Sequence, residues 1–233
     1  MKLYAGTSGF SYAEWKGSFY PDDLPAGEML RFYADRLPAV EINNTFYRLP
    51  RASVLTAWGE QVPADFRFAL KASRRITHIK RLRDAESETE YLLRVAEALG
   101  ERLGPILFQL PPNLKADLPR LQAFIALLPQ GVRAAFEFRH PSWSELGVRE
   151  ALRGRGCAMV IDDTEEAPAA EIEATTDWGY LRLRRQDYDA AALAAWAQRI
   201  AGQSWSEAYV FFKHEEAGAG PRLAADFLAL RQS

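Results

Sequence analysis

The 233-residue sequence has one cysteine, three histidines and no long uninterrupted hydrophobic segment. A single cysteine, Cys157, cannot form a disulfide within the chain, so we expect a reducing compartment. The N-terminal segment lacks the apolar core of a secretory signal peptide. No segment approaches the roughly 20 apolar residues that a membrane-spanning helix needs. These absences predict a cytoplasmic protein that does not enter a membrane.

The chain also lacks a strong overall charge. Its 29 lysines and arginines nearly balance its 31 aspartates and glutamates, and the formal net charge is −2. Such a balance creates no general attraction to nucleic acids or membrane surfaces. One segment departs from it, because residues 71–83 (KASRRITHIKRLR) contain six basic residues and a histidine but no acid. We therefore expect a local cationic surface there.

Several common catalytic motifs are missing as well. The sequence contains no G-x-S-x-G nucleophile motif, no Walker-type phosphate loop and no G-x-G-x-x-G after an expected strand. A function must therefore be inferred from the arrangement of the remaining polar residues.

Short apolar runs recur along the chain and alternate with segments of helical periodicity. We expect eight strands, at residues 2–6, 39–44, 66–72, 105–110, 134–139, 157–162, 179–184 and 208–213. Clear helical spacing occurs at 87–100, 117–128, 189–201 and 220–230, and weaker spacing at 27–37, 51–60 and 144–154. Eight strands that alternate with helices predict an α/β fold of the TIM (β/α)8 type. We expect residues 1–233 to form a single barrel domain whose helix between strands six and seven, within 163–178, is short or missing.

The expected strands have one apolar and one polar face. In the run AAFEFRHPSW (134–143), Phe136 and Phe138 share one parity, whereas Glu137 and Arg139 share the other. An open parallel sheet covered on both sides would be apolar on both faces. In a TIM barrel, by contrast, the inner face leads to an active site at the C-terminal ends of the strands. The pattern therefore favours a barrel with charged residues at its mouth.

These positions supply the candidate site residues. The candidate general acids or bases are Glu41, Glu137 and Asp162. The candidate substrate contacts are Tyr12, Trp15, Asn43, Lys71, Gln109, Arg139, His140, Arg182 and Lys213. Arginine binds phosphate and carboxylate groups in a bidentate fork, and lysine acts as a point charge. We therefore expect a small anionic ligand or a nucleic acid at the mouth, and an enzyme that acts on phosphate-bearing substrates.

Other interpretations remain open at this stage. The acids and bases could pair with one another in a purely structural network, or form a non-catalytic module that binds nucleic acid or a metabolite. A metal-dependent phosphoesterase with a divalent ion would use His140, His214, Glu137 and Asp162, although nearby cations would repel the metal. A glycosidase needs two facing carboxyl groups, and TIM-barrel glycosidases usually place them at the ends of strands four and seven. In this sequence those strands end with Gln109 and Arg182. We therefore predict no cofactor, with a divalent metal as the alternative.

Long segments of the chain resemble a known family. They are GTSGFSYAEWKGSFYP, VEINNTFYRLP, LKASRRITH, GPILFQLPP, FEFRHPSW and FFKHEEAGAGPRLAADFL. Together they are similar to the YecE-like family, domain of unknown function number seventy-two, over nearly the whole chain. The resemblance implies a TIM-barrel fold and no particular activity. At residues 213–216 this chain has KHEE where a common family form carries asparagines, so a shared ligand contact there is not implied.

Overall fold

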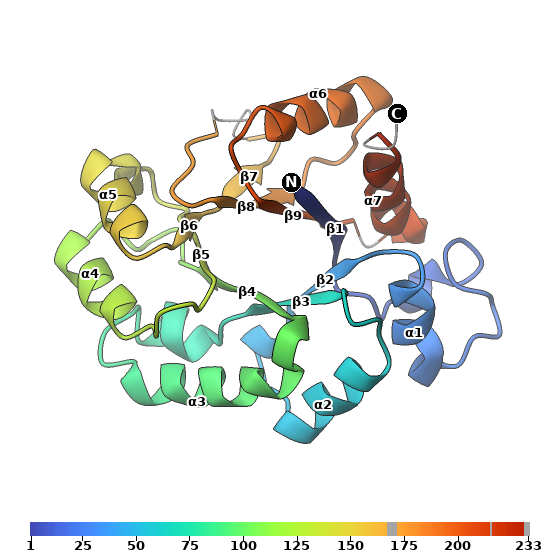
Figure 1. The fold of residues 1–233 in the computed structure, drawn as a ribbon, viewed down its shortest axis with the longest axis horizontal. Helices are drawn as coiled ribbons and strands as arrows, with labels where there is room; N and C mark the ends of the chain where they lie inside the picture. The colour runs from blue at the N-terminus through green and yellow to red at the C-terminus, as the bar shows by residue number, and fades with distance from the viewer. Residues whose placement is uncertain (167–171, 215, 231–233) are drawn as a thin grey trace.

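The computed structural model describes residues 1–166, 172–214 and 216–230. These residues contain nine strands in one sheet, in which every pair of hydrogen-bonded neighbours is parallel (Figure 1). The strands are β1 Lys2–Ser8, β2 Ala39–Ile42, β3 Arg67–Lys71, β4 Leu103–Gln109, β5 Ala134–Glu137, β6 Ala158–Met159, β7 Ile161–Asp163, β8 Trp178–Leu183 and β9 Glu207–Phe212. All eight predicted strands are present, and the sixth is divided into β6 and β7.

The division of the sixth strand nearly closes the sheet into a barrel. The strand order is β6-β5-β4-β3-β2-β1-β9-β8-β7, so β6 and β7 lie at its two edges. Val160 alone separates these two strands, and its backbone N–H donates to the carbonyl of Phe136 at 2.9 Å. The segment therefore pairs first with β5 and then with β8. The prediction of a TIM-type α/β barrel is confirmed.

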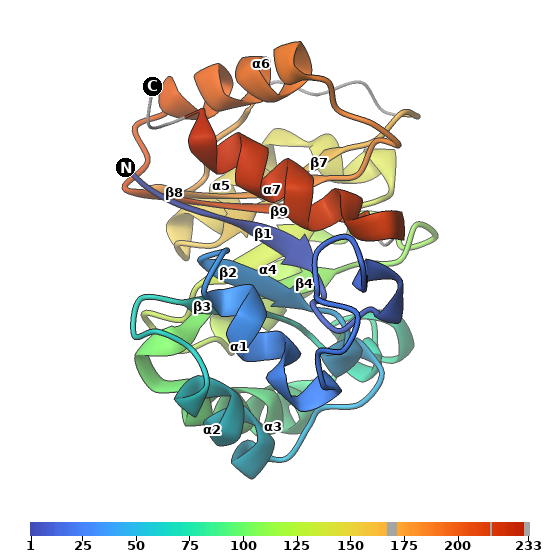
Figure 2. The same ribbon diagram turned by 90° about the vertical axis from the view of Figure 1, so that its right-hand side faces the viewer.

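The described residues form seven α-helices that surround the strands (Figures 1 and 2). They are α1 Met29–Ala34, α2 Ala52–Glu60, α3 Glu86–Ala96, α4 Leu118–Ala126, α5 Leu146–Gly154, α6 Ala190–Ala201 and α7 Ala219–Ala229. Each lies within a segment for which the sequence predicts a helix, apart from boundary shifts of one or two residues. In the described part of the β7–β8 connection no residue is helical, and residues 167–171 lie outside the description. None of the described helices is long and apolar enough to cross a bilayer.

Two helices are capped by the first residue of the segment in which the sequence has helical spacing. The Asp117 side chain accepts a hydrogen bond from the backbone N–H of Arg120 at 3.1 Å, and Pro119 occupies the first turn of α4. Asp189 accepts from the backbone N–H of Ala192 at 2.7 Å at the start of α6. A carboxylate at this position satisfies an otherwise unpaired N–H and complements the helix dipole.

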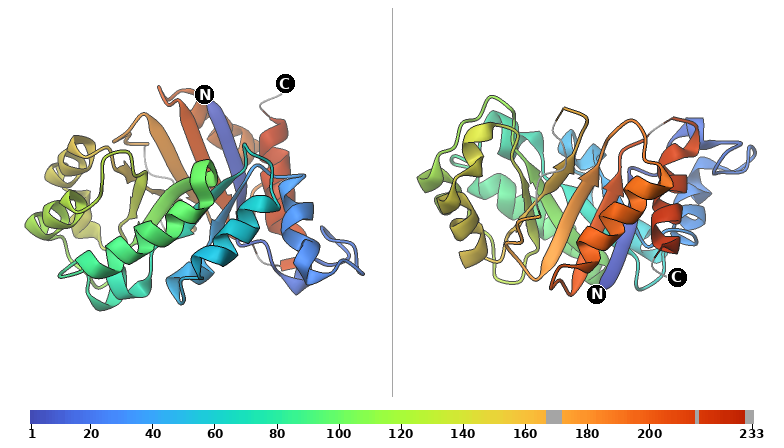
Figure 3. Two further views of the ribbon diagram at one scale, coloured as in Figure 1. Left: turned by 60° about the horizontal axis from the view of Figure 1, so that its bottom comes forward. Right: turned by 90° about the horizontal axis from the view of Figure 1, so that it is seen from above.

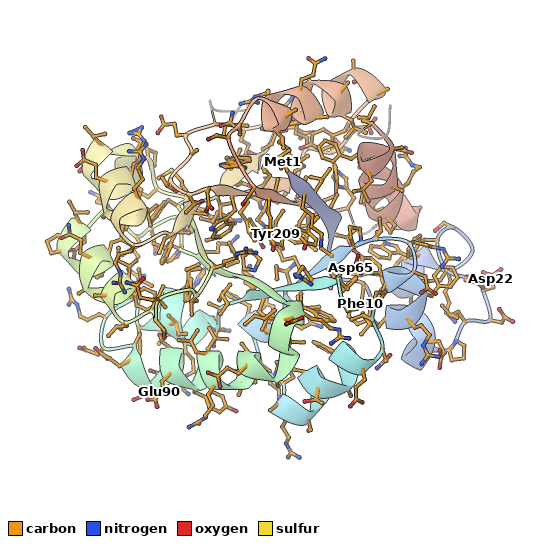
Figure 4. All side chains as sticks on the ribbon, viewed as in Figure 1. Met1, Phe10, Asp22, Asp65, Glu90 and Tyr209 are labelled. Carbon is orange, nitrogen blue, oxygen red and sulfur yellow. The ribbon has the colours of Figure 1, made fainter. Side chains whose placement is uncertain are left out.

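The core has two layers that follow the strand parity. On the helix side, Phe108 and Phe136 stack at 5.2 Å between ring centroids, and both contact Phe124 of α4. Inside the barrel, Tyr4 and Tyr209 stack at 4.9 Å, and Figure 4 shows Tyr209 within the ring of strands. The buried interior cluster is completed by Ala39, Ala69, Leu107, Ala135, Ala158, Trp178, Tyr180 and Phe211. The predicted division into helix-facing and inward-facing residues is confirmed.

The first strand and the last helix are neighbours, so both ends of the described chain belong to the barrel wall. Helix α7 lies against β1, as Figures 2 and 3 show from different directions. Thr7 of β1 is tied to α1, since its backbone N–H donates to the Tyr33 hydroxyl at 2.8 Å. The same hydroxyl donates to the carbonyl of Ala39 at 2.9 Å. Helix α1 thereby fixes the alignment of β1 with β2, two strands that supply residues to the mouth.

We expect Gly6→Ala to destabilise the barrel strongly. A Cβ at Gly6 would lie 1.8 Å from the carbonyl oxygen of Ala39, which belongs to the backbone and cannot move aside easily. The free energy of unfolding, measured by urea denaturation, should fall by roughly 3 kcal/mol or more. The matched variant Gly27→Ala, whose Cβ meets nothing within 4 Å, should change it by less than about 0.5 kcal/mol. Equal effects of the two substitutions would contradict the register of β1 and β2.

Candidate functional site

A buried arginine joins two carboxylates from opposite parts of the barrel. Arg182 of β8 donates from Nη2 to Oε1 of Glu41 on β2 at 2.9 Å, and from Nη1 to Oε2 of Glu137 on β5 at 2.8 Å. All three side chains are at most 2% exposed. A buried charge must be paired because water no longer solvates it. The three residues therefore form a charge triad that spans the mouth, the C-terminal end of the barrel.

The remaining acceptor positions of the two carboxylates are also occupied. Glu41 accepts from the hydroxyls of Ser8 and Tyr180, each at 2.6 Å. Glu137 accepts from Nε2 of Gln109 at 2.9 Å and from Nε of Arg139 at 2.9 Å. Gln109, a predicted substrate contact, donates instead to both carboxylate oxygens of Glu137. Ser8 and Tyr180 were not nominated, although both have the parity of the inward-facing residues.

Charge pairing decides the protonation of the triad. Burial alone would raise the pKa of Glu137, but the guanidinium groups of Arg182, Arg139 and Arg184 outweigh it and lower this pKa to about 2. For Glu41, burial is likewise outweighed by Arg182 and by the hydroxyl donors, and its pKa is lowered. Neither carboxyl group therefore carries a proton that it could donate at neutral pH. A general acid needs such a proton, so neither Glu41 nor Glu137 fits that role.

Asp162 has the opposite electrostatic behaviour. Its carboxylate forms a bidentate pair with Arg184, in which Nε donates to Oδ1 at 2.6 Å and Nη2 donates to Oδ2. Burial and the nearby charge of Glu137 nevertheless outweigh Arg184, and the pKa of Asp162 is raised. Of the three predicted acids, Asp162 is therefore the one whose protonated form its surroundings favour.

Lys71 ends β3 and faces the mouth without a carboxylate partner among the described residues. Its Nζ lies 4.4 Å from the centroid of the Phe46 ring. The Thr45 hydroxyl donates to the carbonyl of Lys71 at 2.7 Å and so fixes the backbone. Burial, together with the charges of Arg182 and Arg139, outweighs the attraction of the buried carboxylates and lowers the pKa of Lys71 to about 8. A lysine at the mouth thus carries a charge that its surroundings do not neutralise.

His78 lies beside this lysine, and sequence reasoning placed it only in the cationic segment. Its ring meets Phe46 edge-on at 4.9 Å, and Nδ1 is 2.9 Å from the Thr77 hydroxyl. Burial lowers the pKa of His78, and four neighbouring cations lower it further. They are Lys71, Arg139, Arg74 and Arg81. The imidazole is therefore neutral at pH 7, within a cluster of positive charge that we call the cation cluster: these four residues and His78.

The segment that carries Arg74, His78 and Arg81 of the cation cluster has an unusual backbone. Arg75–Ile79 form a π-helical turn, and the non-glycine residues Arg81, Leu82 and Asp84 have φ values of 51°, 65° and 49°. Left-handed backbone at such residues costs on the order of 1–3 kcal/mol each and persists only where the surroundings enforce it. Leu82 is 3% exposed and anchors the turn in the core. The packing of the protein therefore holds the cationic segment in one shape.

The other predicted contacts have varied environments. Asn43 lies at the mouth with a buried Oδ1 that no described residue donates to. His140 begins the 3-10 turn Pro141–Ser144, where its Nδ1 accepts from the backbone N–H of Ser142 at 3.2 Å. Lys213 follows β9 and is exposed, and its backbone N–H donates to Leu183. Asn43 thus lies two residues after Glu41 of the triad. His140 has a role in local structure.

The two aromatic residues of the first loop differ in accessibility. Tyr12 and Trp15 are in contact, with ring centroids 4.7 Å apart. Tyr12 is half-buried, and its hydroxyl donates to the carbonyl of Ser8 at 2.7 Å. Trp15 is fully buried against Phe19 and Tyr20. Tyr12 is therefore the residue of this pair that a ligand at the mouth can approach, and Trp15 is a core residue of the loop.

Comparisons with known proteins agree with this architecture. Residues 4–233 match the family described as "Protein of unknown function DUF72". The chain belongs to the DUF72 family. The predicted resemblance to the YecE-like family is thereby confirmed.

Individual DUF72 relatives show how far the similarity extends. The protein YecE of Escherichia coli K12 is 36% identical over 148 residues, which are 60% of this chain and 54% of that protein. The chain thus spans about half the length of this curated relative. The protein YunF of Bacillus subtilis is 26% identical over 229 residues, covering 92% of this chain and 79% of YunF.

Solved DUF72 structures share the fold. A DUF72 protein of Thermotoga maritima superposes with a TM-score of 0.86 at 27% identity over the full length of both chains. A DUF72 protein of Enterococcus faecalis gives a TM-score of 0.81 at 18% identity, covering 99% of this chain and 96% of the other. The second likeness supports the fold alone.

The metal-dependent alternative has no suitable cluster in the described part of this DUF72 barrel. No three His, Cys, Asp or Glu side chains come together there with the spacing of a metal site. Glu137 is surrounded by guanidinium donors, and His140 and His214 bond to other parts of the chain. The four residues proposed from sequence therefore do not converge.

A large cavity lies beside the cation cluster. It has a volume of about 980 Å³ and is lined by Arg139, Asp162 and Arg184 at the ends of β5, β7 and β8. It is also lined by the acids Glu165, Glu166 and Glu173 and by Arg149, which pairs with Glu173. Lys71 and His78 do not line it, and Arg139 borders both regions. Among the described residues the cavity is therefore lined by both arginines and acids, so the cation cluster is the better anion site.

We expect Arg182→Met to destabilise the protein by about 3–5 kcal/mol at pH 7, because it leaves two buried carboxylates without their common cation. Urea denaturation measures this loss. The exposed pair of Arg222 and Asp226, 3.6 Å apart, provides the control Arg222→Met, which should cost less than about 0.5 kcal/mol.

The pH dependence of this loss gives a second criterion. In the wild type the lowered pKa values of Glu41 and Glu137 stabilise the fold above the unfolded value of about 4.3, and this stabilisation disappears as the pH falls towards 2. In Arg182→Met, burial raises both pKa values, so the variant regains relative stability in acid. The difference in the free energy of unfolding between wild type and Arg182→Met should become smaller from pH 7 to pH 3. A difference that stays constant over this pH range would contradict the charge triad.

Proposed function

We propose that the C-terminal mouth of the barrel binds an anionic, phosphate-bearing substrate through the cation cluster. The observation that carries the proposal is that Lys71 has no carboxylate within ion-pair distance among the described residues and contacts Phe46 instead, beside His78, whose pKa is lowered by Lys71 and by Arg139, Arg74 and Arg81. Arg139 is paired with Glu137, and the other positive charges of the cluster repel one another unless an anion joins them. A phosphate group would supply that charge.

The charge balance of the inward-facing residues supports the same proposal. Glu41, Glu137 and Asp162 are matched by three guanidinium groups, those of Arg182, Arg139 and Arg184. These six residues form a neutral set, so the ammonium group of Lys71 is left as an excess positive charge. The alternative in which acids and bases merely neutralise one another therefore accounts for the triad and for Arg184, but not for Lys71.

The triad prepares the mouth for a ligand. Arg139 uses Nε to hold Glu137, and its side chain is 33% exposed, so part of it remains accessible to a ligand. Because Glu137 fixes this guanidinium before any ligand arrives, less conformational entropy is lost on binding. Arginine offers a planar pair of donors that matches two phosphate oxygens. Arg139 and Lys71 are therefore the proposed primary contacts.

A non-catalytic module that binds single-stranded nucleic acid is the second candidate. Tyr47 is 72% exposed, and its ring lies 5.0 Å from that of Phe46, which in turn contacts His78. An exposed aromatic ring beside cations can stack a base. The two candidates differ in their response to salt, since each phosphate neutralised on a polyanion releases counterions and steepens the decline of affinity.

We expect inorganic phosphate to bind the wild type, and Lys71→Met to weaken this binding at least tenfold at pH 7. Loss of one charge-assisted contact costs about 1.5–3 kcal/mol, and each 1.4 kcal/mol corresponds to a factor of ten. Isothermal titration calorimetry measures the affinity. Lys115→Met is the matched control, because Lys115 is an exposed lysine in the loop after β4. An equal effect of both variants, or no binding by the wild type, would overturn the proposal.

The same titration separates the two candidates. For a small phosphate ligand, affinity should fall only weakly between 50 and 200 mM salt, as expected from roughly one or two neutralised charges. A single-stranded oligonucleotide that binds more tightly than phosphate and loses affinity by roughly a thousandfold over that range would favour the nucleic-acid module instead.

A further inference from the structure

We propose that the Nζ of Lys71 forms an imine with the carbonyl carbon of a phosphorylated aldehyde or ketone bound at the mouth. This inference rests on the proposed anion site and assigns its substrate class. It also adds a covalent bond between substrate and protein, which the binding of a phosphate group does not by itself require.

The first support is the position of Lys71. The residue ends β3 in register with Leu107 of β4, and the backbone N–H of Ala72 donates to the carbonyl of Leu107 at 2.8 Å. The carbonyl of Lys71 accepts from the Thr45 hydroxyl at 2.7 Å. The amine is therefore held on a rigid strand end, at the face of a TIM barrel where catalytic groups are located.

The second support is that no acid occupies this amine. Lys80, in the same cationic segment, pairs with Glu88 at 2.7 Å, and its distance is typical of an ion pair. Lys71 has no carboxylate within ion-pair distance among the described residues and contacts the face of Phe46 instead. An ion pair would keep the amine protonated, whereas an unpaired amine beside other cations is a known arrangement for an activated lysine nucleophile.

The third support is the protonation equilibrium. With a pKa of about 8, roughly one-tenth of the Lys71 side chains carry a free lone pair at pH 7. An ordinary lysine with a pKa of about 10.4 has a free amine in only a few of every ten thousand molecules at that pH. The surroundings of Lys71 therefore raise the fraction of the nucleophilic form by more than a hundredfold.

The step balances with the carbonyl compound alone. The lone pair of Nζ attacks the carbonyl carbon and forms a C–N bond, and the carbonyl π electrons move to oxygen, which takes a proton. Both amine protons end on that oxygen, which departs as water when the C=N bond forms. No redox change occurs. In the complex with such a substrate the arginines of the cation cluster hold the phosphate, which leaves the amine of Lys71 to face the carbonyl at a high effective concentration.

The neighbouring His78 supports this chemistry in one further respect. Its imidazole is neutral near pH 7 because burial and the surrounding cations lower its pKa. A neutral ring beside Lys71 adds no further positive charge that would disfavour the approach of a phosphorylated substrate's carbonyl group, and it does not compete for the phosphate. Asp162, with a raised pKa, belongs to the same mouth but pairs with Arg184, so we assign it no part in this step.

Borohydride trapping tests the proposal. Wild-type protein is incubated with glyceraldehyde 3-phosphate or dihydroxyacetone phosphate and reduced with sodium borohydride, and the modified lysines are identified by peptide mass spectrometry. We expect the adduct on Lys71 to exceed that on each other lysine at least tenfold. Excess inorganic phosphate should suppress it, and glyceraldehyde without phosphate should give at least tenfold less. Lys71→Met should abolish it, whereas Lys115→Met should retain it.

The outcomes separate this inference from the proposed function. If inorganic phosphate binds in calorimetry but neither triose phosphate marks Lys71 preferentially, the imine is overturned and the anion site stands. If phosphate does not bind and labelling is spread evenly over the lysines, both are overturned. An adduct on Lys71 whose yield is the same with and without the substrate phosphate would support the activated amine but contradict the assigned substrate class. Thermal unfolding of each variant verifies that it is folded.

Discussion

The buried contact of one arginine with two glutamates is the interaction on which the mouth of the barrel depends. Arg182, Glu41 and Glu137 come from three strands that are not neighbours in the sheet. Each charge would be prohibitively costly in the interior without the others. Their pairing therefore fixes three strand ends relative to one another, and it fixes Arg139 through Glu137. A rigid charged floor below the mouth is the result.

This floor determines which groups are left for chemistry. Two of the three acids are held as carboxylates by the arginines, so they stabilise the site without exchanging protons at neutral pH. The charge that remains is that of Lys71, beside a neutral His78 and a set of arginines. The functional part of the mouth is therefore displaced from the triad towards the end of β3 and the strained segment that follows it.

Much of this arrangement was predictable from residue parity. Alternation along a strand is enough to place Glu41, Glu137 and Arg182 on the inner face of a barrel, and helical spacing located all seven helices. The division of the sixth strand was not predictable, because it depends on which neighbour each half of Ala158–Asp163 meets. That Lys71 has no carboxylate partner among the described residues was not predictable either, because it depends on which side chains the fold places around the amine.

The loops were the least predictable part. The left-handed residues after β3 are arginine, leucine and aspartate rather than glycine, the residue that usually marks such backbone. The sequence therefore contains no local pattern that predicts them or the π-helical turn. His78 became a candidate only when this turn placed it against Phe46. Trp15 was nominated as a ligand contact because it is aromatic, whereas tertiary packing buries it. Its place in the core depends on contacts within the loop that the sequence pattern does not reveal.

The central claim is that Lys71 has no carboxylate partner among the described residues and that its ammonium group binds an anion. Titration of the lysine Nζ signals by NMR in protein labelled with ¹⁵N and ¹³C lysine tests this directly, with Lys71→Met to assign the resonance. The account predicts a pKa of about 8 for Lys71 and an increase on addition of inorganic phosphate, because the anion favours the charged form. A pKa near the ordinary value of about 10.4, unchanged by phosphate, would contradict it.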